Sequence, residues 1–198
     1  MNDGLLVFSF TGEALNIDLD DFVTQLYGMI LPLSLMGDIE SSSSSAETSN
    51  LSISSPPPSI SDLLFRALQV IFSPRTGGIA AAPPQRSAAF SKRLLIASLH
   101  WPRTSALRAL NLVHDLIAKN PKLETLLFAE DHIFDGNYRA DVDDPQLCHP
   151  YGTAFWELQV LAAYHMDCSV RIAAKKLLNY STAVNTSLRP SDDRCGSY

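Results

Sequence analysis

The side chains best suited to bind a metal ion lie in the last third of the chain. Cys148 is followed directly by His149, and His165 stands three residues before Cys168. Together the two pairs offer the four nitrogen and sulfur ligands that a structural zinc site uses. A helix-like segment separates them, however, and single Cys and His residues are common in helical cores that hold no metal. The spacing therefore favours ordinary structural positions over a zinc site.

Other familiar catalytic or ligand-binding patterns are missing from the sequence. The carboxylates at Asp141, Asp143 and Asp144 lack the glycine and the terminal glutamate of a calcium loop. The Gly77–Gly78 pair lacks the spacing and the lysine of a phosphate-binding loop, and no nucleophile elbow is present. We therefore predict a non-enzymatic chain with no cofactor and no small-molecule substrate.

Charge is strongly segregated along the 198 residues, although the net charge is only -6. Residues 1–60 hold eight acidic residues and no Lys or Arg, residues 61–124 hold nine basic and three acidic residues, and residues 125–166 hold seven acidic residues and one Arg. A basic middle between acidic flanks can attract a phosphate backbone or an acidic protein surface. The candidate contact residues for RNA or an acidic partner are Arg75, Arg86, Lys92, Arg93, Arg103 and Arg108.

Two alternatives to this basic surface stay open at this point. An acidic flank could fold against the basic middle and neutralise it, with Arg86 or Arg93 paired to interior carboxylates. The helix expected over residues 83–99 could instead read DNA, since Gln85, Arg86, Lys92 and Arg93 are residue types that contact base edges. That helix lacks a clear turn-helix partner.

Apolar residues recur at helical spacing through most of the chain, and no convincing strand pattern is present. Acids at the start of the first segment, and Ser61, Thr104 or Ser105, Thr153 and Asp167 before later ones, suit helix N-termini. We expect Pro32 to bend or end the first helix unless it continues as a short turn to Met36. We also expect Trp101 to lie at a helix end and Trp156 to lie in the core. The predicted helices span 18–31, 61–73, 83–99, 104–119, 123–128, 153–161 and 167–178.

These segments predict an all-α fold, a HEAT/armadillo-like helical-repeat stack of about six or seven helices. We expect a segment with one amphipathic helix over 1–36, a disordered Ser/Pro-rich linker over 37–59, a helical domain over 60–180 and a flexible tail over 181–198. The apolar stretch Phe22–Met36 is too short to cross a bilayer, and three cysteines cannot form a paired disulfide framework. We therefore expect a soluble protein of a reducing compartment without a membrane partner.

Several stretches of sequence are similar to those of a known family. The segment Ile71–Leu95 (IFSPRTGGIAAAPPQRSAAFSKRLL) and the following SLHWP motif at Ser98–Pro102 resemble the CCAAT-binding-factor domain of the nucleolar complex-associated protein family, its fungal members above all. Further likeness covers about residues 12 to 180 in preserved order. It is carried by Gly12–Phe22 (GEALNIDLDDF), Leu116–Pro121 (LIAKNP), Asp143–Leu147 (DDPQL) and Phe155–Leu158 (FWEL).

The resemblance implies a role that composition and spacing do not. Members of the family look like non-catalytic helical-repeat scaffolds of the nucleolus and nucleus. They pair with another nucleolar complex protein and associate with precursors of the large ribosomal subunit. The resemblance also implies a link to replication initiation, and the basic residues given above become candidates for contact with ribosomal RNA. Members are usually longer, so we expect this chain to be a fragment.

Overall fold

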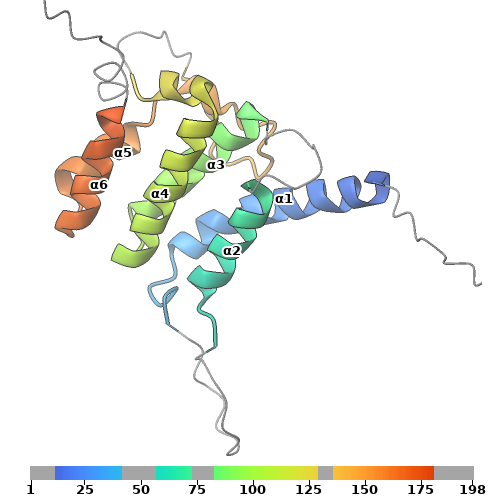
Figure 1. Ribbon diagram of the computed structural model, residues 1–198, viewed down its shortest axis with the longest axis horizontal. Helices are drawn as coiled ribbons and strands as arrows, with labels where there is room; N and C mark the ends of the chain where they lie inside the picture. The colour runs from blue at the N-terminus through green and yellow to red at the C-terminus, as the bar shows by residue number, and fades with distance from the viewer. Residues whose placement is uncertain (1–11, 42–56, 73–82, 129–135, 181–198) are drawn as a thin grey trace, which may run out of the picture.

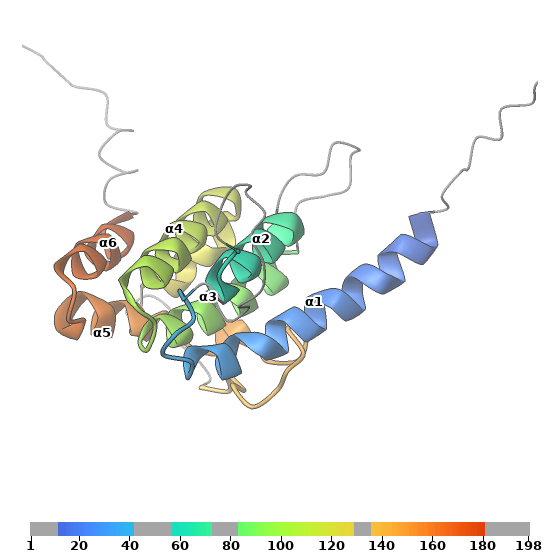
Figure 2. The ribbon, with the colours of Figure 1, turned by 90° about the horizontal axis from the view of Figure 1, so that it is seen from below.

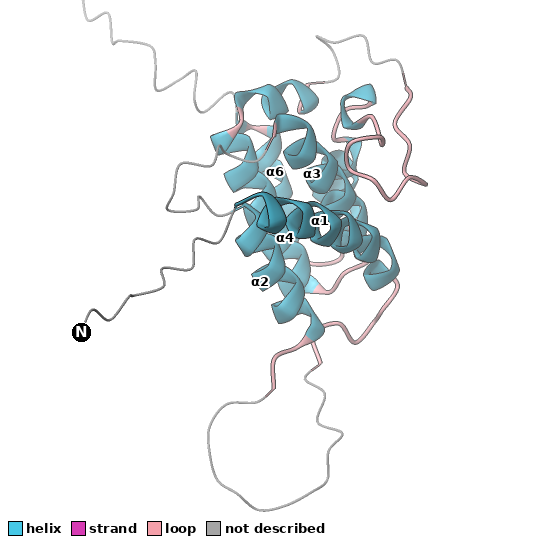
Figure 3. Ribbon diagram, turned by 90° about the vertical axis from the view of Figure 1, so that its right-hand side faces the viewer, coloured by secondary structure: helices cyan, strands magenta, loops and turns pink. Residues whose placement is uncertain are grey.

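The computed structural model describes residues 12–41, 57–72, 83–128 and 136–180, and it describes the side chains of the first helix from Asp20 onward. Within these ranges the chain forms only helices and loops (Figures 1 and 3). The prediction of an all-α fold is therefore confirmed. The helices are α1 (Gly12–Ser34), α2 (Ile60–Phe72), α3 (Pro84–Ser98), α4 (Arg103–Lys119), the 3-10 helices η1 (Pro121–Leu126) and η2 (Pro150–Gly152), α5 (Trp156–Tyr164) and α6 (Cys168–Leu178).

The six α-helices stack in two layers. Figure 2 shows α2, α4 and α6 in one row and α1, α3 and α5 in the row against it. Contacts follow the same order, because α1 packs on α3, α3 on α5, α2 on α4 and α4 on α6, while α3 also packs on α4 and α5 on α6. The successive pairs α3/α4 and α5/α6 therefore stack side by side, and α1 and α2 extend the two layers. A helical-repeat stack is built in this way, which confirms the predicted arrangement.

Helix α1 contributes one apolar stripe to the core. Val23, Leu26, Tyr27 and Ile30 are all less than 4% exposed, and their spacing places them on one helical face. Pro32 lies inside the helix, which ends two residues later at Ser34 and continues as a turn through hydrogen bonds from Leu35 and Met36. A proline this close to the C-terminus removes one late hydrogen bond without breaking the helix.

Helix α3 lies at the centre of the fold and is buried on almost every side. Its buried residues are Ser87, Ala88, Ala89, Phe90, Ser91, Lys92, Arg93, Leu94, Leu95, Ala97 and Ser98. The alanines and serines let neighbouring helices approach closely, and the Phe90 ring packs edge-to-face on Tyr27 at 5.1 Å and on Phe72 at 5.3 Å between ring centroids. A helix buried all round cannot also be a surface helix.

The start of α2 is fixed by Ser59 and not by Ser61 as predicted. Ser59 Oγ accepts a hydrogen bond from the Asp62 backbone N–H at 3.1 Å, and Asp62 Oδ2 accepts one from the Ser59 N–H at 3.2 Å. This reciprocal pair is a capping box. The hydrogen bonds from Ser59, followed by the one from Arg108, hold the pKa of Asp62 below its usual value of 3.8. Ser61 is buried and instead hydrogen-bonds Ser105 Oγ at 2.9 Å.

The start of α4 also differs from the prediction. Neither Thr104 nor Ser105 caps the helix; Pro102 occupies the cap position and makes no side-chain cap. Instead the carboxylate of Glu40 accepts hydrogen bonds from the Ser105 backbone N–H at 2.6 Å and from its hydroxyl at 2.8 Å. A carboxylate at a helix N-terminus interacts favourably with the free N–H groups there. A residue distant in sequence thus supplies the missing acceptor.

The predicted N-cap is correct for one of the last two α-helices and wrong for the other. Asp167 caps α6 as predicted, accepting from Ser169 N–H at 2.7 Å and Val170 N–H at 3.2 Å. Helix α5 has Phe155 at its cap position and no side-chain cap, so the prediction of Thr153 was wrong.

The two tryptophans take different positions. Trp101 is 2% exposed, and its Nε1–H donates to the Leu33 carbonyl at 3.2 Å, which ties the end of α3 to the end of α1. Trp156 is 47% exposed, so the prediction that it lies in the core was wrong. Helix α5 is apolar on nearly every side, and its pattern therefore does not reveal which face is buried.

The predicted division into segments remains a prediction, and residues 42–56 of the linker and the tail from 181 lie outside the described residues. Helix α1, predicted as a separate segment, shares the core with α3. Ile39, at the beginning of the predicted linker, is fully buried and its carbonyl accepts a hydrogen bond from Ser61 N–H at 2.9 Å. These contacts make α1 and residues 39–40 part of the same packed unit as α2 to α6.

Candidate interaction surface

Arg93 lies at the centre of the fold and not on its surface. Its side chain is fully buried, and its guanidinium group donates to the carbonyls of Tyr27, Ala140 and Val142 at 2.9–3.0 Å and to Asp143 Oδ1 at 2.8 Å. The group also stacks over the Tyr27 ring at 3.8 Å. A planar guanidinium with several donors suits this role. Arg93 thereby fastens α1 and the 140–143 loop to α3.

Lys92 is buried beside Arg93 but faces a different group of side chains. Its Nζ lies 3.0 Å from both carboxylate oxygens of Glu157, it donates to the Ala154 carbonyl, and it lies 5.5 Å from the ring centroids of Tyr138 and Trp156. Neither charged side chain of this ion pair has exposed surface. Burial lowers the pKa of Lys92 and raises that of Glu157, and the attraction between the two opposes both shifts. The pair fastens α5 to α3.

The remaining described members of the predicted basic surface also have carboxylate partners. Arg86 pairs with Asp20 at 2.8 Å, Arg103 with Asp167 at 3.6 Å, and Arg108 with Asp62 at 2.7 Å. Only Arg103 and Arg108 keep substantial exposure, with 61% and 34% of their side-chain surface accessible. Arg75 lies outside the described residues.

These pairs correct part of the sequence-based interpretation. Lys92 and Arg93 have no accessible surface and so cannot contact RNA or a partner from these positions. Asp20, Asp143 and Glu157 come from the acidic flanks, so the flanks do fold against the basic middle. Arg86 and Arg93 do pair with carboxylates of the acidic flanks, but these are not interior carboxylates, because the side chains of Asp20 and Asp143 are 51% and 71% exposed. The fully buried ion pair is the one between Lys92 and Glu157.

The burial of Lys92 and Arg93 also argues against the alternative that the helix over residues 83–99 reads DNA bases. The helix that would have to enter a DNA groove is α3, the central helix of the stack. Gln85 donates to the Gln146 carbonyl at 3.2 Å and Arg86 is held by Asp20. With Lys92 and Arg93 buried, none of the four side chains that would have read bases is both exposed and unengaged.

The exposed basic side chains without an ion-pair partner are not the ones predicted from the sequence. Among the described residues, exposed basic side chains with no carboxylate within 4.0 Å are Arg66, Lys119, Lys122, Lys175 and Lys176. All except Lys122 belong to α2, α4 or α6, which form one layer. The sequence does contain a signal for Lys175 and Lys176, because no acidic residue stands three or four positions from either.

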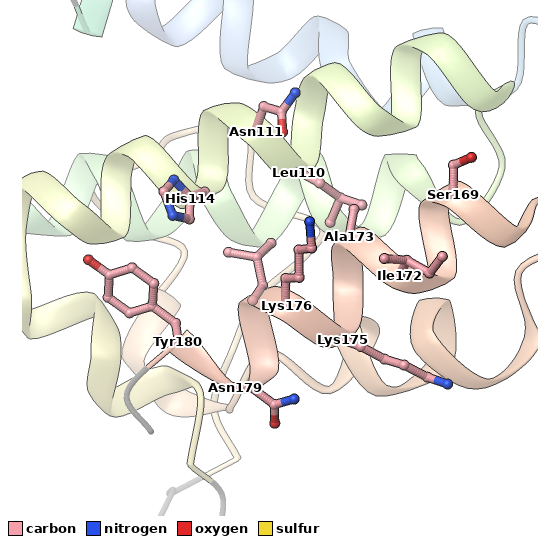
Figure 4. Close-up of a pocket in the computed structure, with 11 residues that line it drawn as sticks. Leu110, Asn111, His114, Ser169, Ile172, Ala173, Lys175, Lys176, Asn179 and Tyr180 are labelled. Carbon is pink, nitrogen blue, oxygen red and sulfur yellow. The ribbon is translucent and has the colours of Figure 1, made fainter. Parts of the chain in front are cut away.

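Two grooves follow the exposed side of this layer. The open groove between α4 and α6 has a volume of about 900 Å³ and is lined by Leu110, Asn111, His114, Ser169, Ile172, Ala173, Lys175, Lys176, Leu177, Asn179 and Tyr180 (Figure 4). A smaller groove of about 450 Å³ between α2 and α4 is lined by Phe65, Gln69, Phe72, Arg108, Asn111, Leu112, Asp115 and Lys119. We call the two grooves and the side of α4 between them the α2–α4–α6 face.

The residues considered for zinc lie in unrelated surroundings. Cys148 is buried and its thiol donates to the Pro145 carbonyl at 3.6 Å, whereas Cys168 is exposed at the start of α6. His165 accepts a hydrogen bond from the Asp167 N–H at 3.1 Å. Over the part of the chain that the structure describes, no three His, Cys, Asp or Glu side chains are grouped as metal ligands would be. No described helix is both long and apolar enough to span a bilayer.

Comparison with known proteins points to one group. The model of the CBF/Mak21 family matches residues 5–174. Nucleolar complex-associated protein 3 of Schizosaccharomyces pombe is 32% identical over 169 residues, which cover 83% of this chain and 22% of that protein. Its namesake in Saccharomyces cerevisiae is 29% identical over 156 residues (76% and 23%), and the human nucleolar complex protein 3 homolog is 26% identical over 188 residues (95% and 21%). The chain thus spans about a fifth of the length of these relatives.

Proposed function

The chain belongs to the CBF/Mak21 family, and from that membership we propose that it is a non-enzymatic scaffold segment acting in ribosome biogenesis. The relatives are nucleolar complex proteins by name, which supports a location in the nucleolus and the nucleus. In finer terms, we propose that the chain serves the assembly and export of the large subunit and pairs with another nucleolar complex protein. A second role in replication initiation rests on the family resemblance alone.

The family match is the observation that carries this proposal, and the fold supports it. The charged residues with the most extensive contacts, Lys92 and Arg93, hold helices together. On the layer of α2, α4 and α6, the described residues form two grooves and carry accessible lysines without ion-pair partners. Such a surface suits the binding of macromolecules, as in other helical stacks.

Co-purification of precursor RNA tests the function. The tagged chain is expressed in yeast, its location is imaged, and the RNA that purifies with it is quantified for precursors of the large and of the small subunit. We expect nucleolar signal and enrichment of large-subunit precursors. A diffuse signal, or equal recovery of both precursor classes, would contradict the proposal. A chain with Leu94→Asp, which places a charge in the fully buried core, serves as the unfolded control.

Direct contact with ribosomal RNA is a separate part of the proposal. It is assigned to Arg103 and Arg108, the accessible members of the predicted set, and to Arg75. We expect the double change Arg103→Glu and Arg108→Glu to weaken RNA binding and to lower the slope of log affinity against log salt by about one for each phosphate that is no longer neutralised. Filter binding at several salt concentrations measures this slope. An unchanged slope in the variant would remove these residues from the RNA-binding surface.

A further inference from the structure

The α4–α6 groove combines an apolar floor with positive charge that the described part of the chain leaves uncompensated. Leu110, Ala173 and Leu177 form the floor, and Ile172, at the edge, is 50% exposed. None of the eleven lining residues is acidic, in a chain whose net charge is -6. The α2–α4 groove differs, because Asp115 there offsets part of the charge of Arg108 and Lys119.

The groove has the direction and length to receive a helix. Arg103 near the start of α4 donates to Ser169 near the start of α6 at 3.1 Å, while His114 packs against Tyr180, just beyond the end of α6, with ring centroids 5.4 Å apart. The two helices therefore run parallel along its length. Figure 4 shows Ser169 at one end and His114 with Tyr180 at the other. A groove between two packed helices is a common seat for an amphipathic helix.

We propose that the α4–α6 groove binds an amphipathic helix of a partner protein, with apolar side chains against Ile172 and Ala173 and with Asp or Glu side chains beside Lys175 and Lys176. The inference rests on the proposed scaffold function and specifies its partner-binding site. An RNA backbone suits the two lysines, but it would set sugar and phosphate groups against the apolar floor, where they lose hydration without gaining hydrogen bonds. The charge and the floor together match a helix with an apolar stripe and an acidic edge.

Photo-cross-linking from within the groove tests this directly. Benzoylphenylalanine replaces Ile172 in the full chain, the chain is irradiated in a nuclear extract, and the attached segment is sequenced by mass spectrometry. We expect one dominant partner segment with apolar residues at helical spacing and acids along one edge. Benzoylphenylalanine at Val70 on α2 is the matched control, because Val70 has the same 50% exposure outside this groove.

Charge reversal tests whether Lys175 and Lys176 recognise the cross-linked partner segment. Lys175→Glu with Lys176→Glu is expected to lower the cross-link yield by about tenfold or more, since like charges then face each other. The equal charge change at Arg66 and Lys122, which are exposed and outside the groove, should leave the yield unchanged. Replacing the acids of the captured segment by Lys should restore cross-linking to the Lys175→Glu/Lys176→Glu chain. Circular dichroism verifies that both variants keep their helix content.

Several results would overturn the inference. One is a cross-link to RNA or to residues 181–198 of the chain itself. Others are adducts on many different proteins, or no adduct. The last is a cross-link yield that does not change on charge reversal at Lys175 and Lys176. Recovery of large-subunit precursor RNA is measured in the same samples. If wild-type chain recovers the precursor while the groove result fails, the groove assignment falls and the scaffold function stands. If wild-type chain recovers no precursor, the proposed function itself fails.

Discussion

Replacement of Arg93 by alanine is expected to lower the free energy of unfolding by about 3–5 kcal/mol. The change empties a fully buried site and removes the donor for the carbonyls of Tyr27, Ala140 and Val142. Asp143 adds little to the loss, because its side chain is 71% exposed and can turn to water. Urea unfolding followed by circular dichroism measures the difference between variant and wild type.

Arg103→Ala is the matched control for Arg93→Ala. Arg103 also pairs with an aspartate, but it is 61% exposed, so its removal should cost no more than about 1 kcal/mol. The loss of unfolding free energy for Arg93→Lys should lie between those for Arg93→Ala and Arg103→Ala. An ammonium group cannot donate hydrogen bonds to all the oxygens that the guanidinium reaches. Equal stability of the Arg93→Ala and Arg103→Ala chains would show that Arg93 does not fasten α1 and the 140–143 loop to α3.

Replacement of Lys92 by alanine is expected to have a comparable effect through a different mechanism. It leaves the Glu157 carboxylate buried without its counter-charge, which typically costs about 3–5 kcal/mol. The double change Lys92→Met with Glu157→Leu removes both charges while filling most of the space. We expect the double variant to be more stable than either Lys92→Ala or Glu157→Ala, because apolar replacement of a complete buried pair is often neutral. Urea unfolding of the four chains gives the comparison.

The dependence on pH distinguishes this mechanism from a simple loss of packing. Burial already raises the pKa of Glu157 above its usual 4.5, and the attraction of Lys92 opposes that rise. Without Lys92 the pKa should rise further, so that the folded chain binds a proton that the unfolded chain releases above about pH 4.5. The Lys92→Ala chain should therefore lose stability relative to wild type as pH rises from about 5 to about 7. A pH-independent deficit would point to packing alone.

Helix positions could largely be predicted from the sequence because they depend on local pattern. The start of α3 at Pro84 and its end before Trp101, and the cap of α6 by Asp167, involve residues close together in the chain. The caps of α2 and α4 were missed for two reasons. Ser59 and Asp62 form a local capping box that begins two residues before the predicted cap, and Glu40 reaches Ser105 from far along the chain.

The burial of Lys92 and Arg93 could not be read from the sequence. Adjacent basic residues in a helix usually face water, and the carboxylates that permit burial here are Glu157 and Asp143, far along the chain. Charge segregation did indicate that acidic flanks could neutralise the basic middle, but not which pairs form. The α4–α6 groove could not be predicted from the sequence because it depends on the packing of two helices between which η1, η2 and α5 lie in the chain.

Buried charges hold the helical stack together, whereas exposed charges are available to partners. Competitive labelling of lysines in the native chain distinguishes the two groups. With a limiting amount of an amine-reactive acetyl ester and readout by mass spectrometry, we predict rapid modification of Lys119, Lys175 and Lys176, and protection of Lys92 until the chain is unfolded in urea. Modification of Lys92 at the rate of Lys175 in the native chain would contradict a buried, structural role of Lys92.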